Sequence, residues 1–129
     1  MKTRVLVADD DEGLRLLYRL ILQRAGFEVI EAANGEQTLA RALDSAPALI
    51  LLDIMMPGMN GFEVCQRLKS DERTGRVPVI LVSAMEDVPR LNETLKAGAD
   101  ACIKKPIGAR ELVARLQDLL GAHNAVYAV

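Results

Sequence analysis

The sequence has few of the residues that mark secreted, zinc-binding or membrane-spanning proteins. It contains two cysteines, Cys65 and Cys102, in 129 residues. Cysteines so few and so far apart do not indicate a disulfide framework or a zinc site, so we expect two reduced, partly buried thiols. No apolar run is long enough to cross a bilayer, and the start, Met1–Ala8, has no secretory signal. These absences predict a cytoplasmic protein.

The sequence also has no large excess of positive or negative charge. Sixteen basic and eighteen acidic residues give a net charge of −2, and the pI is about 5.4. Binding to a phosphate backbone needs clustered Lys and Arg, so we expect no direct contact with nucleic acid and none with a membrane. Hydrophobic residues make up 50% of the chain and charged residues 26%, which predicts one folded core.

Short apolar segments alternate with longer helical patterns along the whole chain, which is typical of βα units on a parallel sheet. Five units can be counted, with no internal repeat or linker. The second strand carries Glu28 and Glu31 and is expected at an edge, whereas the first, third and fourth are almost entirely apolar. The predicted strands are Arg4–Ala8, Glu28–Ala32, Leu49–Asp53, Val79–Ser83 and Ala101–Ile103.

The helices carry their own start and stop signals. Asn34 with Gln37, and Asn60 with Glu63, resemble capping boxes, and Gly26 is expected to end the first helix. In that helix, Leu16, Leu17, Leu20 and Ile21 are expected to form the buried stripe. The predicted helices are Leu14–Arg24, Gly35–Asp44, Gly61–Lys69, about Pro89–Ala97, and Ala109–Leu120 with Gly121 beyond it.

Polar side chains stand at the ends of four of the five strands. Asp9, Asp10 and Asp11 follow the first, Asp53 ends the third, Ser83 ends the fourth, and Lys105-Pro106 follows the fifth. Each alone has an ordinary explanation, such as helix capping for the three acids or a solvated charge for Lys105. In a doubly wound sheet, however, the strand ends form the ligand site. Carboxylates gathered there repel one another unless a cation neutralises them, and hard oxygen donors select Mg²⁺.

Four segments together resemble the response-regulator receiver family: Val5–Glu12, Leu51–Gly61, Ala97–Asp100 and Lys105-Pro106. The resemblance runs from Lys2 to about Leu120, so residues 1–121 are expected to form a receiver domain and Ala122–Val129 a short tail. It implies an α/β flavodoxin-like fold: a doubly wound five-stranded parallel sheet of strand order 2-1-3-4-5 with five helices. A tail this short fits a stand-alone receiver and an excised domain equally well.

The resemblance also implies a role for each site residue. Asp53 is expected to be the phosphoacceptor, taking its phosphoryl group from a phosphohistidine on a sensor kinase or phosphotransfer protein. Asp10 should bind Mg²⁺ directly and Asp9 through water, with Asp53 and the backbone carbonyl of Met55 completing the protein ligands. Lys105, placed by a cis bond to Pro106, and the Ser83 hydroxyl should bind phosphoryl oxygens.

The resemblance further implies that phosphorylation shifts the domain between two conformations. This change would reach a partner or output domain through the face of the fourth helix, fifth strand and fifth helix. The chain is therefore expected to be a signalling domain that promotes its own phosphorylation and dephosphorylation rather than an enzyme. Two departures stand out: Cys102 replaces the usual switching aromatic, and Met55 and Met85 stand where polar groups often guide a hydrolytic water. His123, beyond the last predicted helix, is expected to be solvated and not a phosphodonor.

Two other functions fit the pattern less well. A phosphatase or phosphotransferase with an aspartyl nucleophile would have a second acid two residues after the nucleophile, where this chain has Met55. A degenerate receiver that serves only as a binding scaffold would lack phosphorylation residues, and here all are present.

Overall fold

The apolar segments form one sheet in the computed structural model, which describes residues 2–84, 93–94 and 96–127, with side chains described as far as residue 122. All neighbouring strands are parallel, in the order β2-β1-β3-β4-β5, so the predicted flavodoxin-like topology and the edge position of β2 are confirmed. The strands are β1 (Arg4–Ala8), β2 (Glu28–Ala32), β3 (Leu49–Asp53), β4 (Val79–Ser83) and β5 (Ala101–Lys104).

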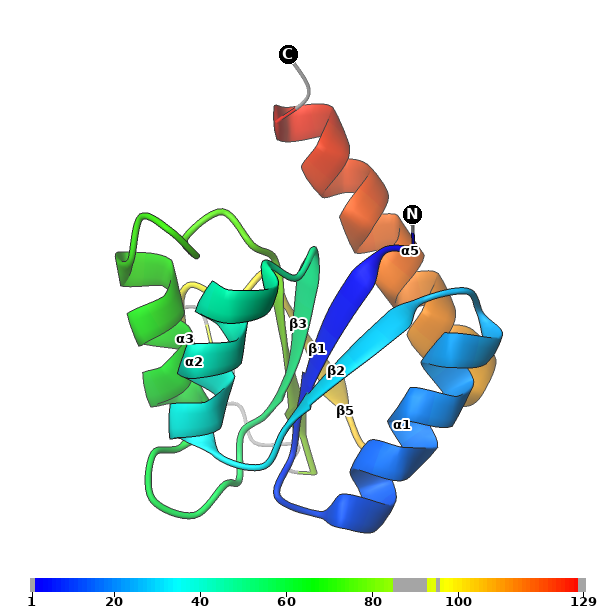
Figure 1. The fold of residues 1–129 in the computed structure, drawn as a ribbon, viewed down its shortest axis with the longest axis horizontal. Helices are drawn as coiled ribbons and strands as arrows, with labels where there is room; N and C mark the ends of the chain where they lie inside the picture. Colours follow the sequence, from blue (N-terminus) through cyan, green and yellow to red (C-terminus); the bar gives the residue numbers. More distant parts are fainter. Residues whose placement is uncertain (1, 85–92, 95, 128–129) are drawn as a thin grey trace.

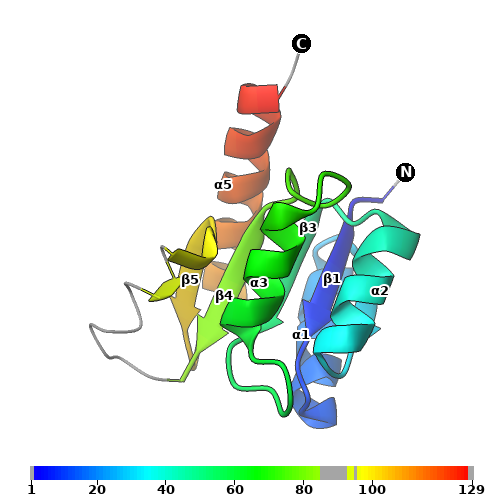
Figure 2. The ribbon, with the colours of Figure 1, turned by 90° about the vertical axis from the view of Figure 1, so that its left-hand side faces the viewer.

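Helices cover both faces of this sheet (Figure 1). Helices α1 (Glu12–Arg24) and α5 (Ala109–Tyr127) lie on one face, and α2 (Gly35–Ser45) and α3 (Gly61–Ser70) lie on the other. The view turned by 90° shows α2 and α3 in front of the central strands (Figure 2). The helix predicted at about Pro89–Ala97 lies mostly outside the described residues, of which 93–94 and 96–97 are helical.

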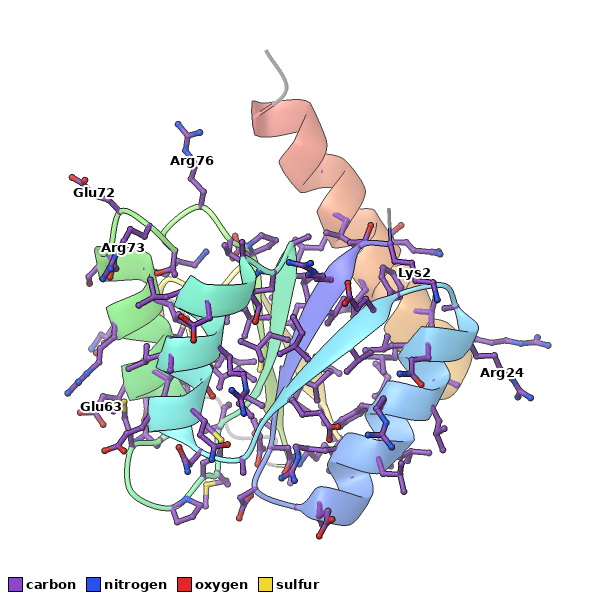
Figure 3. The ribbon with its side chains drawn as sticks, in the orientation of Figure 1. Lys2, Arg24, Glu63, Glu72, Arg73 and Arg76 are labelled. Atoms are coloured by element: carbon purple, nitrogen blue, oxygen red, sulfur yellow. The ribbon has the colours of Figure 1, made fainter. Side chains whose placement is uncertain are left out.

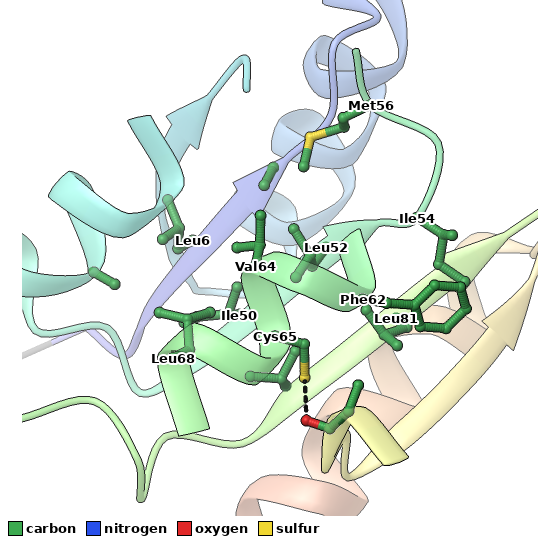
Figure 4. Close-up of a cluster of buried hydrophobic side chains, with 14 of the residues drawn as sticks. Leu6, Ile50, Leu52, Ile54, Met56, Phe62, Val64, Cys65, Leu68 and Leu81 are labelled. Atoms are coloured by element: carbon green, nitrogen blue, oxygen red, sulfur yellow. Dashed lines mark hydrogen bonds between the residues drawn. The ribbon is translucent and has the colours of Figure 1, made fainter. Parts of the chain in front are cut away.

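Two apolar cores lie on opposite sides of the sheet, because successive side chains of a strand point to opposite faces. Strands β3 and β4 are buried along their whole length, as covered parallel strands must be. The core under α2 and α3 is shown in Figure 4, where the Cys65 thiol donates to the carbonyl of Ala97 at 3.4 Å. Burial raises the pKa of Cys65 to about 11, so it is a packing residue and not a thiolate.

Asn34 and Asn60 cap their helices, which is the asparagine half of each predicted capping box. Asn34 accepts from the backbone N–H of Gln37 at 2.8 Å, while the Gln37 side chain accepts from the N–H of Ala33 at 2.8 Å. Asn60 accepts from the N–H of Glu63 at 3.0 Å. Helix α1 begins at Glu12, two residues before the predicted start, because Asp11 accepts from the N–H of Leu14 and acts as the N-cap.

The prediction of the buried stripe of α1 was wrong in most of its members. Leu17 and Leu20 are 51% and 55% exposed, and Leu16 is also exposed. Tyr18 and Leu22 are buried instead, with Leu14 and Ile21 packed beside them. Apolar residues occupy a wide arc of this helix beside a polar row, so periodicity alone did not select which part of the arc is buried. Contact with β1 and α5 selects the row that contains Tyr18 and Leu22.

The predicted end of the last helix was also wrong. Helix α5 continues through Gly121 to Tyr127 and extends past the edge of the sheet (Figure 1). A glycine within a helix costs about 1 kcal/mol relative to alanine, which lowers stability without forcing a helix to end. Residues 122–127 are therefore helical, and the backbone around His123 belongs to α5.

The surface carries charges of both signs. Six exposed charged side chains are labelled in Figure 3: Lys2, Arg24, Glu63, Glu72, Arg73 and Arg76. None of the helices within the described part of the chain combines the length and apolar character that a bilayer crossing requires.

Candidate functional site

The strand ends gather four predicted site residues at one edge of the sheet. Asp9 follows β1, Asp53 ends β3, Ser83 ends β4 and Lys105 follows β5. Asp9 is 2% exposed and Asp53 is 5% exposed, and Ser83 is also buried. Carboxylates are rarely buried unless they are paired, so this placement indicates a site built around charge.

Lys105 pairs with both buried carboxylates. Its ammonium nitrogen lies 3.3 Å from Asp53 Oδ1 and 3.4 Å from Asp9 Oδ2. The bond between Lys105 and Pro106 is cis, as the family resemblance implied, and the backbone N–H of Lys105 donates to the carbonyl of Ser83 at 2.7 Å. The lysine is thus tied to β4 by its backbone and to β1 and β3 by its side chain.

The electrostatics of the site oppose a fully ionised Asp53. Burial raises the pKa of Asp53, and the neighbouring Asp9 raises it further, while Lys105 and the backbone N–H of Met55 act against this rise. Burial lowers the pKa of Lys105, but the Asp53 and Asp9 carboxylates outweigh burial and leave that pKa raised. One ammonium therefore neutralises only part of the negative charge.

The remaining negative charge suits a divalent cation. One carboxylate oxygen from each of Asp9, Asp10 and Asp53 lies within 4.8 Å of the others, so the structure brings the three predicted acidic ligands together. Asp10 is exposed, which leaves room for water. All three donors are hard oxygens, and a small, partly hydrated cation takes one or two carboxylates together with water. The donor set fits such a metal ion.

The loop after Asp53 folds back beneath the acceptor. The backbone N–H of Gly61 donates to the carbonyl of Ile54 at 2.9 Å, closing a turn in which Gly58 has a φ of 78°. A side chain at Gly61 would meet the backbone of Asp53 and Ile54. Met55 is 57% exposed at the mouth, and its N–H contacts the Asp53 carboxylate.

The structure locates the other residues singled out from the sequence only in part. Cys102 packs partly buried against the core under α2 and α3, on the face of β5 opposite to Ile103. Met85 and the side chain of His123 lie outside the described residues, so the expectations for them stay predictions.

Sequence reasoning missed one residue beside the site. The guanidinium of Arg15, on α1, donates through Nη1 to the backbone carbonyl of Asp9 at 2.7 Å and through Nε to Glu31 of β2 at 3.3 Å. No local pattern predicts these contacts, because Arg15 and Glu31 are 16 residues apart and meet only where α1 crosses the edge strand.

Comparison with known proteins shows which family the chain matches. Residues 5–117 match the model of the family described as response regulator receiver domain. The phosphate regulon transcriptional regulatory protein PhoB of Pseudomonas aeruginosa is 42% identical over 116 residues, which cover 90% of this chain and 51% of that protein. The transcriptional regulatory protein ResD of Bacillus subtilis is 38% identical over 92% of this chain and 48% of its own length. The chain thus spans about half the length of the curated relatives it matches.

Solved structures match over their whole length. A CheY-like receiver domain protein from Methanospirillum hungatei has a TM-score of 0.90 at 29% identity, covering 97% of this chain and 98% of that one. The chemotaxis protein CheY4 of Vibrio cholerae has a TM-score of 0.87 at 29% identity and covers 92% and 98%. The sheet order, the paired acids and the family match lead to one conclusion: this chain belongs to the response regulator receiver domain family of two-component signalling.

Proposed function

We propose that Asp53 accepts a phosphoryl group in a Mg²⁺-dependent reaction, with a phosphohistidine of a kinase or phosphotransfer protein as the donor. The observation that carries the proposal is the convergence of three carboxylates and one ammonium at the end of β3. Asp53 lies between the ammonium of Lys105 and the loop that runs from Ile54 to Gly61, which makes it the central acid of the site. Asp9 and Asp10 stand on the neighbouring strand end.

The chemistry is a transfer between two nucleophiles. An oxygen of the Asp53 carboxylate forms a bond to phosphorus, the phosphorus–nitrogen bond of the donor breaks, and the imidazole leaves with its electron pair and takes up a proton. Charge on the equatorial oxygens must be neutralised while this happens. A Mg²⁺ ion held by Asp9, Asp10, Asp53 and the carbonyl of Met55 would supply part of that neutralisation.

The chain's own residues supply the remainder. The ammonium of Lys105 already lies against Asp53 Oδ1, within reach of a phosphoryl oxygen bonded to that carboxylate. The Ser83 hydroxyl, at the end of the next strand, would bind another phosphoryl oxygen. Burial of Asp53 limits access by bulk water, so the transfer would take place in a partly dry site. The fixed position of the Asp53 carboxylate would also help to align the acceptor with the donor.

The proposed output is a shift between two conformations, transmitted by Ser83 and the face formed by the fourth helix, β5 and α5 to a partner protein or output domain. Because Cys102 is much smaller than an aromatic ring, its movement would displace little volume, and Ser83 would carry most of the signal. A phosphohistidine donor is made from ATP, so the proposal places the reaction in the cytoplasm. The domain's own residues would promote both the phosphorylation and the dephosphorylation of Asp53, and no further substrate would be modified.

Incubation with acetyl phosphate and Mg²⁺ tests the proposal. Intact-mass spectrometry should show one added phosphoryl group on the wild-type chain, and none on Asp53→Asn or after chelation of the metal. Equal labelling of the Asp53→Asn variant would refute the assignment of the acceptor.

A further inference from the structure

Arg15 is a cation outside the predicted site that contacts the backbone of the acidic loop after β1. Its side chain is largely buried between α1 and β2, with 16% of its surface exposed. Through Nη1 it donates to the backbone carbonyl of Asp9 at 2.7 Å, and through Nε it contacts Glu31 Oε1 at 3.3 Å. A guanidinium held at both ends has little freedom, which suits it to fix whatever it binds.

The peptide bond that Arg15 holds joins Asp9 and Asp10, two of the three acids of the proposed metal site. The N–H of Asp9 donates to the carbonyl of Ala32 at 3.1 Å, and its Oδ1 accepts from the N–H of Asp11 at 2.9 Å, so Asp9 is fixed by several contacts. Asp10 is exposed, and packing does not fix its carboxylate. The Asp9–Asp10 peptide is planar, so its orientation sets the position of the Asp10 Cα from which the carboxylate must reach the cation.

We infer that Arg15 is a positioning residue for the proposed metal site: by holding the carbonyl of Asp9 it aims the carboxylate of Asp10 at the cation. Glu31 is the anchor, since it ties Arg15 to the edge strand and offsets the charge of the guanidinium. This inference rests on the proposed function, because it needs a cation bound by Asp9, Asp10 and Asp53.

The chain contains a matched control for charge and for the ion pair. Arg19 lies one turn further along α1 on the same side and pairs with the other oxygen of Glu31 at 2.9 Å. Both arginines thus share an anchor and a charge, but only Arg15 reaches the Asp9 carbonyl. A difference between Arg15→Ala and Arg19→Ala consequently reports the contact with Asp9 and not the general field of α1.

The test is the affinity for Mg²⁺ itself, measured by calorimetric titration and by the amide NMR signals of Asp9–Asp11. Arg15→Ala should weaken Mg²⁺ binding about tenfold, the order expected for the loss of one charge-assisted hydrogen bond. Arg19→Ala should bind Mg²⁺ within about twofold of wild type, because surface pairs contribute little. Equal affinities of Arg15→Ala and wild type, or equal losses in both variants, would overturn the positioning role.

Arg15→Lys keeps the inference testable if the alanine variant does not fold. One ammonium group cannot span Asp9 and Glu31 together, so lysine should restore only part of the affinity. Full recovery with lysine would mean that charge alone acts, which contradicts the inference. Failure of the wild-type chain to bind Mg²⁺ would instead refute the metal site, and with it the proposed function.

Discussion

The backbone carbonyl oxygen of Asp53 lies 2.5 Å from the position that a β-carbon would occupy at Gly61. The same β-carbon would lie 2.7 Å from the Cα of Ile54. Both neighbours are backbone atoms, which cannot move away as a flexible side chain can. The glycine that begins α3 is therefore what allows this helix to pack directly beneath the acceptor strand.

Replacing Gly61 with alanine should destabilise the domain and displace Asp53. We expect a loss of about 2–4 kcal/mol in the free energy of unfolding, the range for overpacking against a rigid backbone. Urea denaturation measures it. Gly121→Ala is the control: apart from its own helix backbone, nothing in the described part of the chain lies within 4 Å of its added methyl group. As a helical position it should gain up to about 1 kcal/mol. A neutral Gly61→Ala variant would contradict the close packing of α3 against β3.

Replacing Asp53 with asparagine should stabilise the protein in the absence of metal. Burial and Asp9 raise the pKa of Asp53 in the folded state, so folding favours the protonated carboxyl. The contribution of this protonated carboxyl to stability is fully present below the unfolded-state pKa. That contribution is lost as the pH rises through the folded-state pKa. At pH 7 the ionised carboxylate therefore opposes folding, although the attraction of Lys105 offsets part of this effect.

Calorimetric melting in chelator, at pH 7 and at pH 4, measures this effect. Asp53→Asn should melt above wild type at pH 7, and the difference should narrow at pH 4, where the wild-type acid takes up a proton. Saturating Mg²⁺ should raise the melting temperature of wild type much more than that of Asp53→Asn. A variant that melts below wild type at pH 7 without metal would contradict the electrostatics of the site.

Loss of the Lys105 ammonium should slow phosphorylation. Lys105→Met retains much of the side-chain volume but removes the charge that lies 3.3 Å from Asp53 Oδ1. We expect the rate of labelling by acetyl phosphate to fall about 10²-fold or more, as when one preorganised donor is lost from a transition state. Lys104→Met, one residue earlier and exposed, is the control and should label at nearly the wild-type rate. Equal rates in the two variants would leave Lys105 without a role in transfer.

The aspartyl phosphate should hydrolyse slowly because of Met55. This exposed thioether stands at the mouth of the site and cannot orient the attacking water or accept its proton. Met55→Asn should speed the loss of the phosphoryl group by roughly tenfold, the low end of what positioning contributes. Time-resolved intact-mass spectrometry after removal of the donor gives the rate. A rate equal to or slower than wild type would count against this role of Met55.

The sequence alone determined the strands, the sheet class and the acids of the site. Apolar segments such as Leu49–Asp53 predict covered strands because the strands of a parallel sheet are buried on both faces. The caps at Asn34 and Asn60 act within four residues. Strand order 2-1-3-4-5 came from the family resemblance. It places Asp9 and Asp53 on neighbouring strand ends, so their convergence could be predicted before any coordinate was known.

Only the tertiary structure decided which face of α1 is buried, how far α5 runs, and that Arg15 meets the carbonyl of Asp9. Apolar residues occupy a wide arc of α1, so hydrophobic periodicity does not select the buried part of that arc until β1 and α5 pack against Tyr18 and Leu22. The contact of Arg15 with Glu31 joins residues 16 positions apart, and it depends on how α1 lies across β2. Capping and strand propensity are local interactions, whereas these features arise from contacts between elements that the chain brings together only when it folds.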